Sequence, residues 1–248
     1  PAVHEAIAAE LEPGELLIAD GHHRYETALA YQREVGGEGA HDYVLMALVS
    51  LEDPGLTVFA THRMLKELRP DQLEGIGEMA EAGFDLQKVA EEDLIPDSAE
   101  PEVSFGYMDA SAKQPWRLRL NENGRRALDS EMEGRSEAYR SLDSAGLEEL
   151  FLQRAVGLSP EDIAAKKGLG YTANADEAIA AVRSGSYDAA FFLRPTPIDQ
   201  VRAVAAAGET MPMMVLLVKN GAYGSLKVKT AVVASGASTD SSVSTNDL

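Results

Sequence analysis

The sequence predicts a protein of the α/β or α+β class, with a mixed sheet flanked by helices and two lobes. In the first part of the chain, short apolar runs of strand length alternate with longer amphipathic runs of helical length. In the middle part, strand-like segments with alternating polarity come as a pair, as in antiparallel sheets. With 248 residues the chain is long enough for two modest domains. We expect a motif-bearing lobe over residues 1–94, a second α+β lobe over residues 95–234 and a disordered tail over residues 235–248.

The first lobe is predicted to open with the helix "PAVHEAIAAELEPG", which stops at a Pro-Gly pair. The apolar run Glu15–Ala19 predicts a buried strand, and Arg24–Val35 predicts a helix because its apolar positions recur every three to four residues. A long apolar strand is expected over Tyr43–Leu51, and a strand running into a helix over Thr61–Leu68. Because Pro1 stands in the middle of a helix-like segment, we expect the natural protein to continue upstream.

The second lobe begins with an acidic and mostly helical stretch. The segments "EVSFGYMD" and "WRLRLNENG" predict an antiparallel pair, with Asn-Glu-Asn-Gly as a turn. A helix, a strand over Asp188–Leu193 and another helix are expected to follow. Ser159-Pro160 and Thr196-Pro197 are predicted helix starts, with the hydroxyl residue as N-cap and proline in the first turn.

The charge and composition exclude several classes of function. The chain carries 22 Lys and Arg against 41 Asp and Glu, and the resulting −19 repels polyphosphate backbones, so we expect no nucleic-acid partner. No stretch approaches the roughly 20 apolar residues that span a bilayer. The sequence has no cysteine, which removes disulfides, thiolate metal sites and cysteine nucleophiles. We therefore predict a soluble, cytoplasmic protein whose partner is a small-molecule substrate.

Two of the five histidines are adjacent in "LLIADGHHRYETALAYQRE", where a predicted strand turns into a predicted helix. The first N–H groups of a helix have no intrahelical partner, and the positive end of its dipole favours an anion. Gly21 lets a ligand approach the backbone closely. His22, His23 and Arg24 add hydrogen-bond donors, and Arg24 can contact phosphate through two bonds at once. The turn is therefore a candidate phosphate cradle.

Asp20, at the start of this turn, has three possible roles: capping the helix, orienting an imidazole or holding a metal-bound nucleotide. A purely structural interpretation stands beside these, since Asp-Gly is a common turn and a histidine at a helix start is often a hydrogen-bonding residue. We favour function, because packing does not explain three cationic or titratable side chains in a row on a turn. We assign no metal site, because adjacent histidines on extended backbone point to opposite sides.

A second histidine-arginine pair occurs in Thr61-His62-Arg63. If this segment also follows a strand and opens a helix, both pairs lie at the same edge of one sheet, where ligands bind in open α/β folds. His62 and Arg63 are therefore further candidates for binding a cofactor. Alternatively, His62 caps a helix and Arg63 faces solvent. Lys166 and Lys167 can contact an anion, or stabilise a helix end and face solvent.

Three segments together resemble the DUF1015 family, a bacterial and archaeal group of uncharacterised function whose hallmark is Ala-Asp-Gly-His-His-Arg-Tyr. They are "LLIADGHHRYETALAYQRE", "DYVLMALVSLEDPGLTVFATHRML" and "FFLRPTPIDQVRAVAAAGETMP", and the resemblance covers residues 1–212. Family members are longer at the N-terminus, which agrees with the expected upstream segment. They usually continue after Met-Pro with a Lys-Ser-Thr-Tyr-Phe-type segment, whereas Met211-Pro212 is followed here by "MMVLLVKNGAYG". We therefore assign to this chain no role that the Lys-Ser-Thr-Tyr-Phe-type segment has in the family.

The motif Asp20–Arg24 is also similar to the phosphate-binding motif of the ParB/sulfiredoxin-like superfamily, which includes nucleotide-dependent free-serine kinases. This resemblance implies that Gly21, His23 and Arg24 contact phosphates, with Asp20 and His22 nearby. The acid-base residue of these kinases lies upstream of the motif, in a region that we expect to be missing from this chain.

We therefore predict an enzyme that binds a nucleotide, ATP or ADP with Mg²⁺, and that can transfer phosphate to a small hydroxyl substrate such as serine. The candidate catalytic residues are Asp20, His22 and His23, and the candidate cofactor-binding residues are Gly21, His23, Arg24, His62 and Arg63. Two alternatives stay open. One is a non-catalytic nucleotide-binding regulatory module, and the other is a metal-dependent hydrolase that uses His22, His23 and His62.

Overall fold

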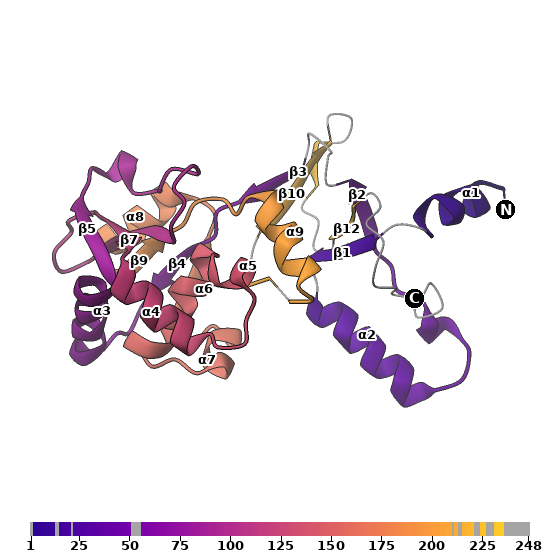
Figure 1. Ribbon diagram of the computed structural model, residues 1–248, viewed down its shortest axis with the longest axis horizontal. Helices are drawn as coiled ribbons and strands as arrows, with labels where there is room; N and C mark the ends of the chain where they lie inside the picture. Colours follow the sequence, from indigo (N-terminus) through magenta and orange to yellow (C-terminus); the bar gives the residue numbers. More distant parts are fainter. Residues whose placement is uncertain are drawn as a thin grey trace. The chain divides into compact units, whose positions relative to one another are not determined.

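The computed structural model describes residues 2–12, 15–20, 22–50, 56–209, 211–212, 215–220, 224–226 and 231–235 (Figure 1). The chain forms two compact units, one of Pro1–Val58 with Leu216–Leu248 and one of Phe59–Val215. The fold is α+β, within the predicted class. The boundary expected after residue 94 falls inside the second unit, between two strands of one sheet. The predicted tail lies outside the described residues, except for Ser235.

The first unit is built around a three-stranded sheet in the order β1-β12-β2, in which β12 runs antiparallel to β1 and parallel to β2. The element bounds are α1 Ala2–Leu11, β1 Glu15–Asp20, α2 His22–Val35, η1 Ala40–Asp42, β2 Ala47–Ser50 and β12 Ala231–Ser235. The predicted opening helix, first strand and second helix are confirmed. The strand expected over Tyr43–Leu51 is shorter in the structure, because β2 begins at Ala47. Tyr43 is 81% exposed, so the residues just before β2 do not pack on a sheet.

A second three-stranded sheet has the order β11-β10-β3, with bounds β3 Leu56–Phe59, β10 Val215–Asn220 and β11 Gly224–Leu226. Strands β3 and β10 contain the two points at which the chain passes from one unit to the other. Since no sequence pattern marks these points, the division into units follows from pairing between segments far apart in the chain.

The second unit contains a six-stranded sheet in the order β5-β7-β6-β9-β4-β8, and every pair of neighbours is antiparallel. Its strands are β4 His62–Leu65, β5 Phe84–Lys88, β6 Ser104–Asp109, β7 Trp116–Leu120, β8 Leu169–Thr172 and β9 Ala189–Phe192. The helical elements are α3 Pro70–Gly83, η2 Glu91–Asp93, α4 Glu122–Glu131, α5 Glu137–Arg140, α6 Asp143–Leu147, the π-helix η3 Glu148–Ala155, α7 Pro160–Ala164, α8 Ala175–Ser184 and α9 Ile198–Ala206. The predicted antiparallel pair is confirmed as β6 and β7.

Both faces of the six-stranded sheet carry core side chains. On one face Phe191 packs within a cluster of aromatic side chains, and its ring centroid lies 4.9 Å from that of Phe151 in η3. Its neighbour Phe192 packs on the other face with Ala178 and Val182 of α8. Because successive side chains of a strand point to opposite faces, a strand buried on both faces is apolar throughout, as "AAFF" is.

Helix starts follow the predicted pattern in one place and depart from it in two others. Ser159 caps α7 through the Asp162 N–H at 3.1 Å, with Pro160 as the first helical residue, as predicted. At α9 the N-cap is Pro197, so the cap predicted at Thr196 is wrong. Asn-Glu-Asn-Gly is not a hairpin turn, because the Asn121 side chain accepts from the N–H groups of Asn123 and Gly124 and starts α4.

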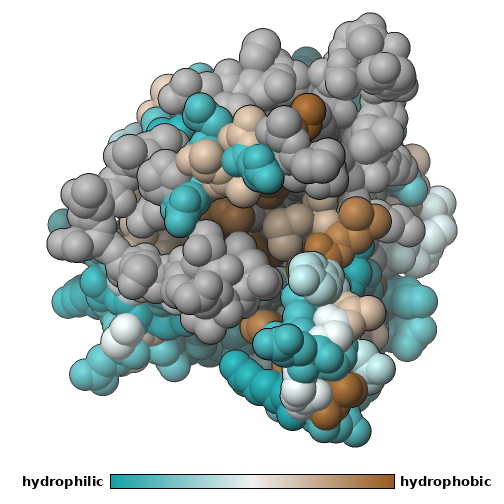
Figure 2. Space-filling model, turned by 90° about the vertical axis from the view of Figure 1, so that its right-hand side faces the viewer, coloured by the Kyte–Doolittle hydropathy of each residue, from teal (hydrophilic) through white to brown (hydrophobic). Residues whose placement is uncertain are grey.

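Most of the large apolar side chains that are exposed among the described residues belong to the first unit. They lie on α1, α2, the segment after η1 and β2. Figure 2 shows apolar surface next to hydrophilic surface on the face turned to the viewer. The described apolar core lies almost wholly in the second unit. Within the described residues, no helix is both long and apolar enough to cross a membrane.

Candidate functional site

The histidine-histidine-arginine motif lies where β1 turns into α2. β1 ends at Asp20 and α2 begins at His22, so His22, His23 and Arg24 are the first three residues of the helix. The predicted strand-to-helix placement is therefore confirmed, although the helix begins two residues earlier than Arg24. Gly21 lies outside the described residues, and for Asp20, His22 and His23 the structure describes the backbone alone.

The electrostatic surroundings of this helix start favour an anion. The first turn of α2 has no acidic residue, whereas the first turn of each other α-helix in the described part of the chain contains at least one. Acidic residues in a first turn offset the positive end of the helix dipole. The first turn of α2 therefore adds no negative charge that would offset the positive end of its dipole, in a protein whose formal net charge is −19. Arg24 is exposed.

The strand that leads into the motif has an irregularity just before it. Ile18 of β1 pairs with Val232, but Asp20 pairs with Ala231, so the register between β1 and β12 shifts around Ala19. An extra residue of this kind bends a strand and changes the direction of the residues that follow, and it is frequent next to functional sites. The sequence contains no signal for it, because β12 comes from the far end of the chain.

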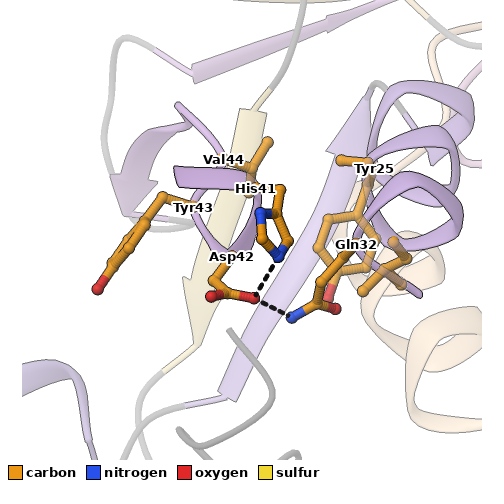
Figure 3. A pocket seen from close by; sticks show the side chains of 8 residues that line it. Tyr25, Gln32, His41, Asp42, Tyr43 and Val44 are labelled. Carbon is orange, nitrogen blue, oxygen red and sulfur yellow. Dashed lines mark hydrogen bonds and ion pairs between the residues drawn. The ribbon is translucent and has the colours of Figure 1, made fainter. Parts of the chain in front are cut away.

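The other end of α2 is fixed against η1. Gln32 donates through Nε2 to Asp42 Oδ1 at 3.0 Å (Figure 3). The Gly39 N–H donates to Asp42 Oδ2 at 2.7 Å. These hydrogen bonds, with a smaller effect of His41, hold the pKa of Asp42 below its usual value. Tyr31 meets His41 edge to face, with ring centroids 6.4 Å apart.

The hollow between α2 and η1 is too small for a ligand. Its volume is about 30 Å³, which is room for one or two water molecules. It is lined by Tyr25, Ala28, Leu29, Gln32, His41, Asp42, Tyr43 and Val44 (Figure 3). We interpret it as packing that orients α2 and not as a binding site.

The second histidine-arginine pair is not at a helix start. His62–Leu65 is strand β4, so the helix expected over Thr61–Leu68 is wrong, and β4 belongs to the six-stranded sheet while β1 belongs to the three-stranded one. The expectation that both pairs lie at one edge of one sheet is therefore also wrong. β4 is extended because it hydrogen-bonds to β8 on one side and β9 on the other, and this pairing outweighs the local pattern.

His62 is a core residue of the second unit. It is 1% exposed, its Nδ1 accepts from the Leu193 N–H at 3.2 Å, and its ring centroid lies 5.4 Å from that of Phe192. Burial, with a smaller effect of Arg63, lowers the pKa of His62 from 6.5 to about 4. The imidazole is therefore neutral at physiological pH and accepts a hydrogen bond from the backbone.

Arg63 is buried as well. Its Nη1 donates to the Thr61 carbonyl, and its guanidinium carbon lies 5.5 Å from the ring centroid of Tyr171. Burial lowers the pKa of Arg63, while the charges of Tyr171 and Glu148 raise it. Glu148, the first residue of η3, is a titratable group that the sequence did not single out, and burial raises its pKa. Arg63, Tyr171 and Glu148 lie far apart in the sequence, and only folding brings them close together.

A metal site is not supported by the described side chains. No group of three or more His, Asp or Glu side chains among them is arranged to hold a metal ion. The side chains of His22 and His23 are outside this statement, because the structure does not describe them.

Comparison of folds gives distant likenesses. A conserved hypothetical protein from Pyrococcus furiosus is 16% identical, with 87% of this chain and 82% of that chain covered and a TM-score of 0.45. A free serine kinase in complex with AMP is 14% identical, with 91% and 83% covered and a TM-score of 0.47. Values this low carry no argument about activity.

Comparison of sequences is more decisive. No curated protein matches the chain. Residues 1–145, which include the motif Asp20–Arg24 and strand β4, match the profile of a family described as "Protein of unknown function (DUF1015)". This match covers more than half of the chain, and the chain belongs to the DUF1015 family.

Proposed function

We propose that the protein binds the phosphate groups of a nucleotide at the turn Asp20–Arg24 and transfers its terminal phosphoryl group to the hydroxyl of a small substrate such as serine. The phosphoanhydride bond breaks, the nucleotide shortened by one phosphate is the leaving group, and the acceptor hydroxyl gives up its proton. The observation that carries the proposal is the start of α2, where two histidines and an arginine occupy the first helical turn and that turn contains no acidic residue. α2 has 14 residues, and the first N–H groups of a helix lack intrahelical partners while the positive end of its dipole favours an anion.

Each residue of the turn has a chemical role in this proposal. Arg24 contacts phosphate oxygens through two parallel hydrogen bonds, and His23 adds a further donor. Gly21 gives the phosphate access to the backbone. Mg²⁺ is usually held by one or two carboxylates together with substrate phosphates, so Asp20 would be its protein ligand here. His22 is the remaining candidate for moving a proton.

The proposed chemistry needs little covalent participation by the protein. Phosphoryl transfer is catalysed mainly by positioning and by stabilising the charge on the transferred group. A cluster of cationic donors on a helix start provides both. The general likeness of the motif to that of the ParB/sulfiredoxin-like superfamily, which includes free-serine kinases, agrees with this chemistry.

Calorimetric titration with ATP, ADP and CTP in the presence of Mg²⁺ tests the proposal. Arg24→Ala is expected to weaken nucleotide binding at least about tenfold, since a bidentate charged contact is lost. Arg33→Ala is the matched control, because Arg33 is also an exposed arginine but lies in the last turn of the same helix. Undiminished binding by folded Arg24→Ala protein contradicts the proposal.

A single-turnover assay with labelled ATP separates transfer from mere binding. Label that appears on serine or another small hydroxyl compound supports the transferase. Label that stays on ATP, with binding retained, favours a nucleotide-binding regulatory module instead. Activity that depends on a bound transition metal and is lost on chelation would favour the hydrolase that uses the histidines.

A further inference from the structure

The second unit contains a pocket that shares no residue with the histidine-histidine-arginine turn. Its volume is about 190 Å³. It is formed by three loops, which are those between β4 and α3, between η3 and α7, and between α7 and β8. The lining residues are Leu65, Lys66, Glu67, Leu68, Arg69, Gln72, Val156, Gly157, Leu158, Asp162, Lys167 and Gly168.

Hydrogen bonds between these loops hold the pocket in shape. The Lys66 N–H donates to the Gly168 carbonyl at 2.9 Å, and Gln72 Nε2 donates to the Val156 carbonyl at 2.6 Å. Gly168 has φ +66°, and a Cβ there would come within 3.0 Å of the Lys66 oxygen. This position therefore favours glycine, which lets the two loops approach each other closely without strain.

The charged side chains around the pocket are unusual for this protein. Three lining residues are basic and two are acidic, although the whole chain carries 41 acidic against 22 basic residues. The lining also includes apolar residues, among them Leu65, Val156 and Leu158. A pocket lined by both cationic and apolar residues is suited to an anion attached to a small neutral group.

The three cations differ in how firmly they are engaged. Arg69 makes two hydrogen bonds to Asp71, at 3.1 and 2.9 Å, and we therefore assign it to the helix start of α3. Lys66 Nζ lies 3.9 Å from Glu67, whose side chain is 80% exposed. Lys167 Nζ lies 3.1 Å from Asp162 and is itself 73% exposed. Exposed ion pairs such as Lys66–Glu67 and Lys167–Asp162 contribute little to stability. A dianion can therefore compete with the two carboxylates for both lysines.

We propose that this pocket binds a small phosphate monoester as its dianion, held by the ammonium groups of Lys66 and Lys167. The pocket is smaller than the roughly 300–1,000 Å³ of sites for drug-sized ligands, which excludes a whole nucleotide. The ligand is thus distinct from the nucleotide proposed for Asp20–Arg24. Glu67 acts against the ligand, because its carboxylate competes for Lys66.

The test is a titration of the full chain with inorganic phosphate at constant ionic strength, followed by ¹H–¹⁵N NMR. Saturable shifts are expected at the amides of Lys66, Glu67, Gly157 and Gly168. Lys167→Gln should raise the dissociation constant at these amides about three- to fivefold, the usual size of one exposed charge contact. Glu67→Gln should lower it by a similar factor.

The control is Lys113→Gln, which removes an exposed lysine of the same unit that does not line the pocket. It should leave the dissociation constant unchanged. Shifts at the start of α2 report the other phosphate site and should not respond to Lys167→Gln, so failure of either site is seen separately. Shifts that do not saturate, or that change equally with Lys113→Gln and Lys167→Gln, overturn the proposal.

Discussion

Asp143 and Arg194 form a buried ion pair across 51 positions of the sequence. Arg194 donates through Nε to Asp143 Oδ2 at 2.7 Å and through Nη2 to Oδ1 at 3.1 Å, and the side chains are 10% and 5% exposed. Its remaining N–H groups donate to the carbonyls of Asp97, Glu100 and Glu102. Burial raises the pKa of Asp143, and Arg194 opposes that effect. One side chain therefore ties the start of α6, the end of β9 and the loop before β6.

Arg194→Leu is expected to lower the free energy of unfolding by about 3–5 kcal/mol, because it leaves the Asp143 carboxylate buried without its partner. Urea denaturation measures this change. Arg154→Leu is the control, since the pair of Arg154 with Glu131 at 2.8 Å is exposed and should contribute about 0–1 kcal/mol. Equal losses in the two variants would contradict a special role for the buried pair.

His62 should make the stability of the protein depend on pH. Its pKa is about 4 in the folded protein and 6.5 in the unfolded chain, so between these values the unfolded state binds more protons. The contribution of His62 to the free energy of unfolding is therefore fully present above about pH 6.5. It is lost as the pH falls to about 4, which lowers the free energy of unfolding by roughly 3 kcal/mol.

The variant His62→Gln checks this prediction, because an amide can still accept from the Leu193 N–H but does not titrate. Urea denaturation between pH 7 and pH 4 should show a shallower decline than in the wild type. His41→Gln removes an imidazole of the other unit and keeps His62, so it should retain the decline. A decline of the same size in His62→Gln would show that other groups cause it.

Two glycines in helices are expected to respond oppositely to alanine. A Cβ on Gly124 of α4 would lie 2.1 Å from the Gly83 carbonyl oxygen at the end of α3, so Gly124→Ala must push these elements apart and should cost about 1–3 kcal/mol. Gly77, in the interior of α3, has nothing within 4 Å of such a Cβ, so Gly77→Ala should raise stability by about 0.5–1 kcal/mol. Thermal denaturation of both variants measures the difference in sign.

The hydroxyl of Thr61 is expected to be dispensable for stability. Thr61 is buried and its Oγ1 has no hydrogen-bond partner among the residues that the structure describes, which costs free energy in the folded state. Thr61→Val has nearly the same shape and should be neutral or raise stability by about 1 kcal/mol. Ser104→Ala is the counterpart, because Ser104 Oγ donates to the Leu118 carbonyl at 3.1 Å and its loss should cost about 1 kcal/mol. A large loss in Thr61→Val would reveal a partner for the hydroxyl.

Local features of the chain could be predicted from the sequence because they depend on neighbouring residues alone. The strand predicted over Glu15–Ala19 and the helix predicted over Arg24–Val35 follow from hydrophobic periodicity, and the cap at Ser159 follows from its hydroxyl and the proline after it. The cluster of donors at the start of α2 is fixed by the same local order. This part of the candidate site therefore needed no tertiary information.

Tertiary structure decided what the remaining residues do. Arg63 pairs with Tyr171 in β8 and Phe191 in β9, and these partners, more than a hundred positions away, make its segment a strand and bury it. More than a hundred positions also separate His62 from Leu193, whose N–H donates to it, and Lys66 from Gly168 in the second pocket. Periodicity reports which residues along one element share a face, whereas strand pairing and burial are set by contacts between distant segments, and these alone decide the surroundings of a side chain.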